Sequence, residues 1–540
     1  MRDDIPLIVL GGYLLFLLVL GVVGYLRSKA GAEDYYLAGR RQGWIVSTLT
    51  IMATFFSSWA LLGASGKVYT EGLVFFLFAL NVPLSGACIY LFGRGIRRLG
   101  RQNGYVTPGD MIADYYGGEA VRILVSLTCI LYVVPYVVMQ IQAGGLLFQV
   151  LVEEPLLERW DNFQVGCVVL ALITTVYVMV GGMRSVAWTD VFQGLLLVTG
   201  MLLGGYVVLQ VLGGPAEFME KVAELPEAWL TAPGASRGWP PLFLFSVCLL
   251  GSSGTMVSPA QWMRYYAADS SRTLRRAALI FSLVLTACFL FGVMLVGIGG
   301  QVLYPSPTDA IGNPLFTETG ALQVHEAVRK PDDILIRVLH DQLPAVWPVA
   351  GIWIVSIITV AIAAGSMSTA DSNLHALSAV LTRDIYDRYL RSARREKGSM
   401  WVGRLVILAA AVASLVLVLG AHRAQVAGEP NVLARSLRMI VDVGILAISF
   451  SAQLLPATVD MLWIRRGSRL GVTLGLLAGL GATACFHTYP PFSGSSVGEL
   501  EIRMMPGAWG LIVNCLVLAV VSSLGRPPGK ATEYAEALKR

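Results

Sequence analysis

Long apolar runs follow one another along the whole chain and are separated by short polar stretches. A run of about 20 apolar residues is long enough for a helix to cross a bilayer. The pattern therefore predicts an all-α membrane protein with about thirteen transmembrane helices. Their approximate ranges are 5–26, 45–66, 72–93, 120–150, 163–182, 187–212, 241–260, 275–299, 346–381, 402–420, 437–463, 470–488 and 508–524.

The composition agrees with this class of protein. Of the 540 residues, 55% are hydrophobic and 14% are charged, and the mean hydropathy is +0.66, whereas soluble domains carry roughly 25% charged residues. All seven cysteines fall inside apolar runs, so we interpret them as small core residues without a disulfide framework or metal-ligand spacing. The first run follows Asp3 and Asp4, and we interpret it as a retained helix, not a signal peptide.

Lysine and arginine gather in every second loop, and this distribution predicts the orientation of the chain. They are frequent near 27–41, 94–101, 184, 264–276, 383–397, 465–469 and 526–540, and sparse in the alternate loops. Basic loops stay on the cytoplasmic side of a membrane. We therefore expect a multi-pass protein of the plasma (inner) membrane with its N-terminus outside and its C-terminus in the cytoplasm.

One apolar span carries an unusual group of small polar residues at 363–373. On a helix, Ser368, Asp371, Ser372 and His375 share one face because they are spaced i, i+3, i+4 and i+7. A carboxylate at membrane depth normally faces a cavity, an ion or a partner, and oxygen ligands suit hard cations. We interpret this face as ion-related, although small residues also let helices pack closely. A lone helix histidine is usually a packing residue, so His375 is left out of the site.

Two spans show signs of interruption. Residues 50–66 are rich in Ser and Thr and end in glycines, and residues 250–259 combine Gly, Ser and Pro, which loosen a helix. These are the second and seventh spans, and a separation of five is expected for two inverted repeats of five helices. Broken helices at matching positions of two halves point to the binding site of a transporter.

The spans divide the chain into six parts. They are a first helix and cytoplasmic loop (1–44), inverted repeat 1 (45–212), an outside loop (213–240), inverted repeat 2 (241–463), two peripheral helices (464–525) and a cytoplasmic tail (526–540). A second long outside loop, 300–345, lies within repeat 2. The Pro and Gly content of both outside loops predicts irregular caps.

Residues 181–194 carry a longer motif, which reads Gly-Gly-Met-Arg-Ser-Val-Ala-Trp-Thr-Asp-Val-Phe-Gln-Gly. It resembles the GG-x-x-(A/S)-V-x-W-T-D-x-x-Q signature of the sodium:solute symporter family, which includes proline, pantothenate, monocarboxylate, sialic acid and sugar symporters. Residues 363–373 resemble the Na⁺-binding helix of the family, and the shorter stretches 36–40, 264–269 and 382–386 are similar to other parts of its pattern. The resemblance covers about residues 5–470. It implies a leucine-transporter-like core of five plus five helices, with one helix before it and two after.

The resemblance also implies ligands for Na⁺, the coupling ion. A main site would use backbone carbonyls and hydroxyls of the residues Ala53, Phe56, Gly365, Ser368 and Thr369. A second cation site would use Asp190, Asp371 and Ser372, and Asp371 stands where the family usually has a hydroxyl. Asp190 also suits a helix N-terminus. Some members, including proline symporters, carry an acid beside the first broken helix, where this chain has Phe55.

Candidate solute-binding residues lie on four spans and offer hydrogen bonds and aromatic surface. They are Ser57, Ser58, Trp59, Tyr136, Gln140, Thr255, Ser258 and Gln453. None of them brings a fixed positive charge to the middle of the membrane, so a carboxylate would have to be held by helix N-termini and hydroxyls. Each is also an ordinary packing residue.

We expect a Na⁺-coupled symporter of a small organic solute, of the amino acid, monocarboxylate, pantothenate or sugar type, that works by alternating access as a monomer in the lipid bilayer. A proton-coupled transporter of the same fold remains an alternative because an intramembrane acid also suits a proton. A channel or a membrane sensor of the same fold is a further alternative. A channel would need a continuous polar path, whereas the polar groups here cluster at the middle of the spans, and a sensor of this fold would carry a signalling domain after the last span. No phosphate-binding loop, catalytic motif or nucleic-acid-binding feature is present, so we expect no enzyme, no organic cofactor and no nucleic-acid partner.

Overall fold

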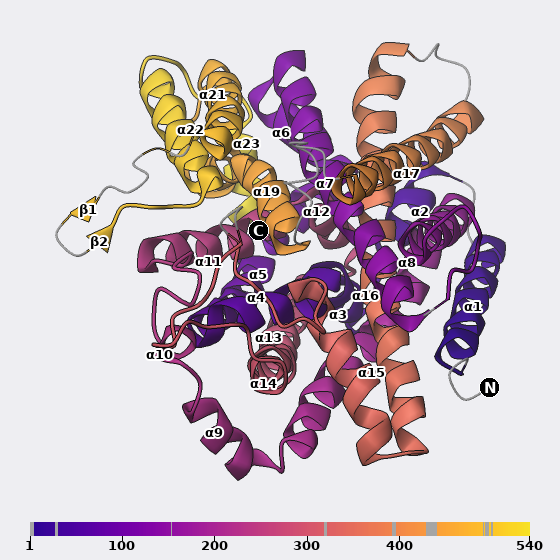
Figure 1. Ribbon diagram of the computed structural model, residues 1–540. Helices are drawn as coiled ribbons and strands as arrows, with labels where there is room; N and C mark the ends of the chain where they lie inside the picture. Colours follow the sequence, from indigo (N-terminus) through magenta and orange to yellow (C-terminus); the bar gives the residue numbers. More distant parts are fainter. Residues whose placement is uncertain are drawn as a thin grey trace.

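The computed structural model describes residues 5–27, 31–152, 154–317, 321–390, 396–427, 440–489, 491, 496–497 and 500–539. Residues 391–395, which belong to the arginine-rich stretch used above for orientation, lie outside these ranges. The described chain is almost entirely helical (Figure 1). A two-residue antiparallel pair, β1 (Ser496–Val497) and β2 (Leu500–Glu501), is the strand structure within the described ranges.

The helices follow the apolar runs of the sequence. In chain order they are α1 (Ile5–Arg27), α2 (Ala32–Leu37), α3 (Trp44–Phe55), α4 (Ser65–Glu71), α5 (Asn81–Asn103), α6 (Pro108–Tyr116), α7 (Glu119–Leu151), α8 (Asn162–Val211), α9 (Pro215–Ala223), α10 (Glu227–Leu230), α11 (Pro241–Met256), α12 (Pro259–Ala267), α13 (Ser271–Cys288), α14 (Leu295–Leu303), α15 (Ile334–Val346), α16 (Ala350–Val380), α17 (Glu396–Val426), α19 (Ile440–Ser451), α20 (Leu455–Val459), α21 (Arg469–Thr488), α22 (Pro506–Ser523) and α23 (Ala531–Lys539).

Ten helical segments of the described chain are long and apolar enough to cross a membrane, or eleven if α11 and α12 form one bent span. Two of these segments, Trp59–Asn103 and Asn162–Val211, have 45 and 50 residues, about twice what one crossing needs. Each contains a glycine with a positive φ angle, Gly72 in the first and Gly182 in the second. These glycines lie where the predicted ranges 45–66 and 72–93, and 163–182 and 187–212, meet. The number of thirteen crossings stays a prediction.

Gly182 is a position where only glycine is readily accommodated. Its backbone has φ 59° and ψ −161°, a region that side chains with a Cβ rarely adopt. A Cβ there would also lie 2.7 Å from Cδ2 of Tyr35. The chain therefore turns at Gly182, in the middle of the Gly-Gly motif.

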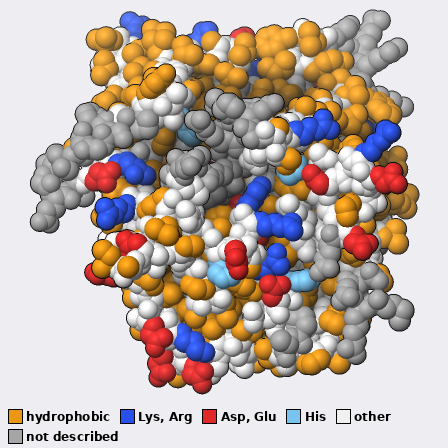
Figure 2. All heavy atoms as spheres, viewed as in Figure 1, with side chains coloured by type: hydrophobic (Ala, Val, Ile, Leu, Met, Phe, Trp, Pro, Cys, Tyr) orange, Lys and Arg blue, Asp and Glu red, His pale blue; other side chains and the backbone are white. Residues whose placement is uncertain are grey.

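The helix α16 lies at the centre of the molecule, and it packs against α1, α7, α8 and α17 (Figure 1). In its most apolar segment 72% of the residues are buried, against 33% for α1 and 22% for α22. The outer helices expose large apolar side chains, as expected where lipid covers the surface. Figure 2 shows one face of the molecule, with hydrophobic side chains along its upper rim and charged side chains over its centre and lower part.

The first helix is closely fitted to α8. A Cβ on Gly21 would lie 2.8 Å from Cβ of Tyr177, and a Cβ on Gly24 would lie 2.8 Å from Ser185. The amide Nε2 of Gln193 donates a hydrogen bond of 3.0 Å to the hydroxyl of Tyr13. The two backbones can approach this closely because glycines stand at the contact.

Candidate functional site

The helix α3 ends in the middle of the protein and exposes backbone groups there. Phe56, directly after the last helical residue, has φ −87° and ψ 107°, which are extended angles. The chain resumes as a π-helical turn at Trp59–Ala64 and continues into α4. A broken helix leaves carbonyl groups without intrahelical partners, so this break can present oxygen atoms to a ligand. The interruption predicted from the Ser- and Thr-rich sequence is present.

The carbonyl oxygen of Ala53 accepts two hydrogen bonds from α16. One comes from the hydroxyl of Ser368 at 3.0 Å and the other from the hydroxyl of Thr369 at 3.2 Å. The Ser368 hydroxyl is also 3.2 Å from the carbonyl oxygen of Gly365. All of these groups are buried. Four of the five residues predicted for the main cation site therefore lie together, and the fifth, Phe56, lies at the break itself.

This group of atoms fits a small hard cation. The donors are carbonyl and hydroxyl oxygens, which are neutral and suit Na⁺ more than a transition metal. Hydroxyls can rotate, so they can donate to the Ala53 carbonyl in the arrangement described here and turn their lone pairs to a cation. Among the described residues there is no cluster of three His, Cys, Asp or Glu side chains that would suit a transition metal.

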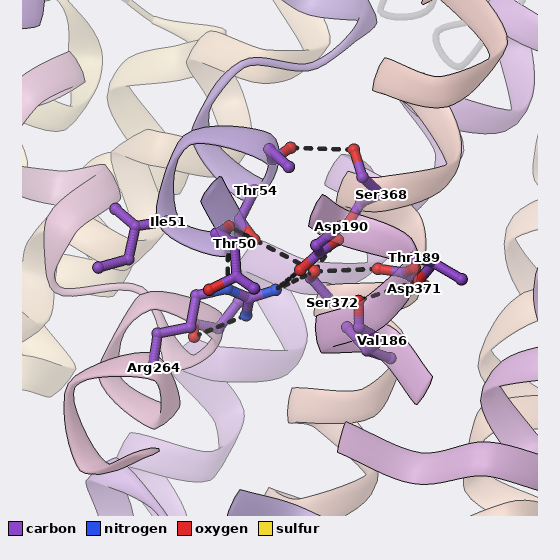
Figure 3. A network of polar contacts seen from close by, with 12 residues as sticks. Thr50, Ile51, Thr54, Val186, Thr189, Asp190, Arg264, Ser368, Asp371 and Ser372 are labelled. Atoms are coloured by element: carbon purple, nitrogen blue, oxygen red, sulfur yellow. Dashed lines mark hydrogen bonds and ion pairs between the residues drawn. The ribbon is translucent and has the colours of Figure 1, made fainter. Parts of the chain in front are cut away.

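A second cluster of polar groups lies next to this site, between α8, α12 and α16 (Figure 3). The guanidinium Nη2 of Arg264 lies 2.9 Å from Oδ2 of Asp190 and also donates to the hydroxyl of Ser372. The Ser372 hydroxyl is 3.0 Å from Oδ1 of Asp371. The other oxygen of Asp371 accepts a 2.7 Å hydrogen bond from the hydroxyl of Tyr177. The three residues predicted for a second cation site are thus brought together.

Arg264 corrects two of our interpretations. Its charge was counted among the loop cations, and we saw no fixed positive charge inside the membrane. In the structure Arg264 belongs to α12 and is 1% exposed. Its remaining donors reach the carbonyl of Thr50 at 3.2 Å and that of Ala260 at 3.1 Å. The sequence does indicate burial of this arginine, because Trp262 lies before it and Tyr265 and Tyr266 follow it, a composition typical of a buried helix.

The solute candidates separate into three groups. Trp59, Tyr136 and Thr255 line one narrow cavity of about 20 Å³, next to the break in α3. Its other walls include Phe78 and Asn81, which the sequence analysis missed. This volume is close to that of a single water molecule, so the cavity is closed in this conformation. The sequence could have indicated Asn81, because it is a single amide directly after the apolar run 72–80.

The remaining candidates are placed differently. The hydroxyl of Ser57 accepts a 3.1 Å hydrogen bond from the backbone of Trp59, and the hydroxyl of Ser58 donates to Oε1 of Gln140 at 2.7 Å. Ser258 is buried in the break between α11 and α12. These side chains support the two breaks and are not among those that line the cavity.

The last solute candidate, Gln453, lies apart from the others. Its amide Nε2 donates to the hydroxyl of Thr483 and to the carbonyl of Gly507, each at 3.2 Å. Its carbonyl is 3.2 Å from the amide of Asn514. These partners lie on α21 and α22, so the glutamine joins the two last spans to the core and does not face the solute cavity.

Phe55 and His375 both lie among aromatic rings. The ring of Phe55 contacts the ring of Phe281 at 5.0 Å, and it forms part of the cavity wall. The imidazole of His375 lies 5.5 Å from the ring of Tyr35 and 5.7 Å from that of Tyr36. This packing agrees with the choice to leave His375 out of the site.

In a chain that is almost entirely helical, a broken helix that faces two hydroxyls on a central helix is typical of membrane transporters with a leucine-transporter-like fold. Comparison with known proteins identifies the group more closely. The chain belongs to the sodium:solute symporter family, whose model matches residues 35–429. Members of this family are transporters, and the chain is accordingly a Na⁺-coupled solute symporter.

Several relatives and solved structures are similar over most of the chain. The sodium/proline symporter of Haemophilus influenzae is 28% identical, over 97% of this chain and 95% of the relative. The sodium/pantothenate symporter of the same organism is 24% identical, over 75% of this chain and 76% of the relative. A solved Na⁺-coupled sialic acid symporter covers 97% of this chain and 98% of its own, with a TM-score of 0.74 and 21% identity. A nucleobase-cation-symport-1 family transporter has a TM-score of 0.55 at 14% identity, over 94% of this chain and 100% of its own. The solved structures support the fold.

Proposed function

We propose that this protein carries a small organic solute into the cell together with Na⁺, by alternating access in the plasma membrane. The observation that carries the proposal is the meeting of Ala53, Ser368 and Thr369, which joins the broken helix to α16. A cation held by these oxygens would bind both elements at once. Each chain contains the whole site, so we propose that a monomer is sufficient.

The proposed coupling follows from the close contact between the helix that carries the main cation site and the wall of the solute cavity. Ser57, beside Trp59 of the solute cavity, has its carbonyl carbon 3.5 Å from the position that a Cβ on Gly365 would take. A cation that orders the break therefore orders the wall of the solute cavity. Each inward Na⁺ gains about 2.3 kcal/mol per 100 mV, and a tenfold gradient adds about 1.4 kcal/mol. Together they can concentrate a neutral solute several-hundred-fold.

The cavity wall limits the kind of solute. It consists mostly of aromatic and aliphatic side chains, with the amide of Asn81 and the hydroxyl of Thr255 as polar groups, and it contains no charged side chain among the described residues. This wall favours a solute with an apolar part and few hydrogen-bonding groups, so among the amino acid, monocarboxylate, pantothenate and sugar types we propose an amino acid or a monocarboxylate before a polyhydroxylated sugar. Phe55 in the wall argues against a proline-type site.

We further propose that Asp190, Asp371 and Ser372 hold a second Na⁺. In the described arrangement the guanidinium of Arg264 lies against Asp190 and Ser372. Because a cation close to this guanidinium would be repelled by it, binding of the second Na⁺ requires the pair between Arg264 and Asp190 to open. A proton on Asp371 is the competing assignment, because an intramembrane carboxyl group is equally suited to a proton.

Uptake into proteoliposomes tests the proposal. The purified protein is supplied with labelled amino acids, monocarboxylates, pantothenate and sugars under an inward Na⁺ gradient, with choline replacing Na⁺ in the control. We expect one class to accumulate in Na⁺ and not in choline. Accumulation in choline that follows an imposed pH gradient would show that a proton, and not Na⁺, is the coupling ion. A lack of concentrative uptake for every solute class would contradict symport of these solutes.

A further inference from the structure

The last helix, α23, is fixed to the face of the molecule where α5 ends. Tyr534 is buried, and its hydroxyl lies 2.6 Å from that of Tyr105. Nη1 of Arg98 on α5 donates a 2.8 Å hydrogen bond to the carbonyl of Leu538. The amine of Lys530 pairs with Asp114. These contacts place one face of α23 opposite α5 and opposite the π-helical turn Asp460–Ile464 that follows α20.

A pocket of about 280 Å³ lies between these three elements, and its chemistry is strongly basic. Four of its eleven lining residues are cations, namely Arg94, Arg98, Arg465 and Lys539, and none of the lining residues is acidic. Within the described part of the chain, none of the four forms a salt bridge with a carboxylate. Converging cations without counter-charges favour an anionic ligand.

The same pocket has an apolar side that faces outward. Leu91 is 55% exposed and Trp463 is 45% exposed. The indole of Trp463 is held in place by the ring of Phe92, 5.6 Å away. Both residues belong to segments apolar enough to lie in a membrane, and tryptophan is enriched where hydrocarbon meets the headgroups. The pocket therefore joins a charged region to a lipid-facing surface.

A glycine at the base of the pocket allows close packing there. A Cβ on Gly95 would lie 2.8 Å from Cδ2 of Leu462 and 3.4 Å from Cδ2 of Leu538. The glycine thus lets side chains from the turn and from α23 meet over α5, with the arginines around them. Because α23 supplies one wall, the pocket exists only while this helix is docked.

We propose that this pocket binds the headgroup of an anionic phospholipid, with the phosphate between the four cations and the acyl chains over Leu91 and Trp463. Basic pockets between membrane helices are known to hold anionic headgroups. A free phosphate ion would use the cations but would gain nothing from the exposed apolar wall, and this favours the lipid. The bound lipid bridges α5 and α23, so it stabilises the docked position of the last helix.

Native mass spectrometry of the purified full-length protein in a non-ionic detergent tests the proposal, with dioleoyl phosphatidylglycerol as the probe. The variant Arg94→Gln with Lys539→Gln removes two exposed cations that hold no backbone group in place. A basic residue near an anionic lipid surface contributes about fivefold in affinity, so the pair should lower the affinity for phosphatidylglycerol about 30-fold. The parent should bind phosphatidylglycerol more tightly than phosphatidylcholine.

A matched control is the variant Arg272→Gln with Arg275→Gln. It has the same change in charge, both residues are exposed, and they start α13 on the same side of the molecule, where Nε of Arg97 donates to the carbonyl of Ala268 at 2.8 Å. The control should bind the lipid like the parent. Equal affinity for the two lipids, an equal loss in both variants, or displacement of the lipid by inorganic phosphate would each overturn the proposal. The assay measures no transport, so its result is independent of the proposed symport.

Discussion

The double substitution Ser368→Ala with Thr369→Ala tests the main cation site most directly. Both hydroxyls are fully buried and reach the carbonyl of Ala53, at 3.0 and 3.2 Å. Alanine removes two of the five proposed ligand oxygens. A buried site leaves little room for water to replace them, so the cation loses two contacts without compensation.

The expected size of the effect follows from the interaction of polar groups with charges. A hydrogen bond to a charged group contributes about 1.5–3 kcal/mol, and a ligand oxygen on Na⁺ is comparable. Taking the lower value for each hydroxyl gives about 3 kcal/mol, and about 1.4 kcal/mol corresponds to a tenfold change in affinity. The Na⁺ concentration for half-maximal transport should therefore rise about 100-fold.

The assay is uptake of the transported solute as a function of Na⁺ concentration. Ser366→Ala is a matched control, because this buried hydroxyl on the same helix donates only to the carbonyl of Ile362, at 3.0 Å. Thr369→Ser keeps the ligand oxygen and should behave like the parent. An unchanged Na⁺ dependence in a well-expressed double variant, or an equal shift in Ser366→Ala, would refute the site.

Three further predictions concern charge and orientation. Asp371→Ala should remove the second Na⁺ from the stoichiometry measured by reversal potentials, whereas Asp371→Ser should keep it with weaker affinity; pH-dependent transport by the parent at saturating Na⁺ would instead indicate a proton. Burial raises the pKa of Asp332, outside the membrane spans, to about 7. Its folded form therefore loses stability as the pH rises from about 4 to 7. Asp332→Asn, which can still accept the hydrogen bond from the backbone of Ile440, should melt higher than the parent at pH 8 and by a smaller margin at pH 5. A cysteine at the exposed Leu390 should react with impermeant thiol reagents only from the cytoplasmic side and one at Ile311 only from outside, and reversed labelling would overturn the orientation.

The helices and their breaks could be predicted because membrane spans follow local rules. A bilayer demands about 20 apolar residues for each crossing, and Gly, Ser and Pro mark the places where a helix can open. Gly182, in the Gly-Gly motif, and the break after Phe55 lie where the sequence placed them. The face of α16 with Ser368 and Ser372 was equally predictable, because helical spacing alone defines it.

The partners of single polar residues could not be predicted, since they depend on contacts between distant segments. Arg264 finds Asp190 at a separation of 74 residues and Ser372 at 108 residues. The distribution of lysine and arginine among the loops carries no information about such partners. The partners of Gln453 could not be predicted for the same reason, because its amide could face either the cavity or a neighbouring helix. In the structure its side-chain oxygen accepts a hydrogen bond from the amide of Asn514.

The close fit of α1 to α8 means that the first helix would take part in any movement of α8. Gly21 and Gly24 leave no space for sliding against Tyr177 and Ser185, so a rocking motion of α8 must carry α1 with it as one rigid unit. The opposite side of α1 exposes apolar residues, with Ile8 69% and Leu15 64% exposed. In the proposed alternating-access cycle this surface would move through the surrounding acyl chains. The viscosity of the bilayer would then slow turnover through a helix outside the two predicted repeats.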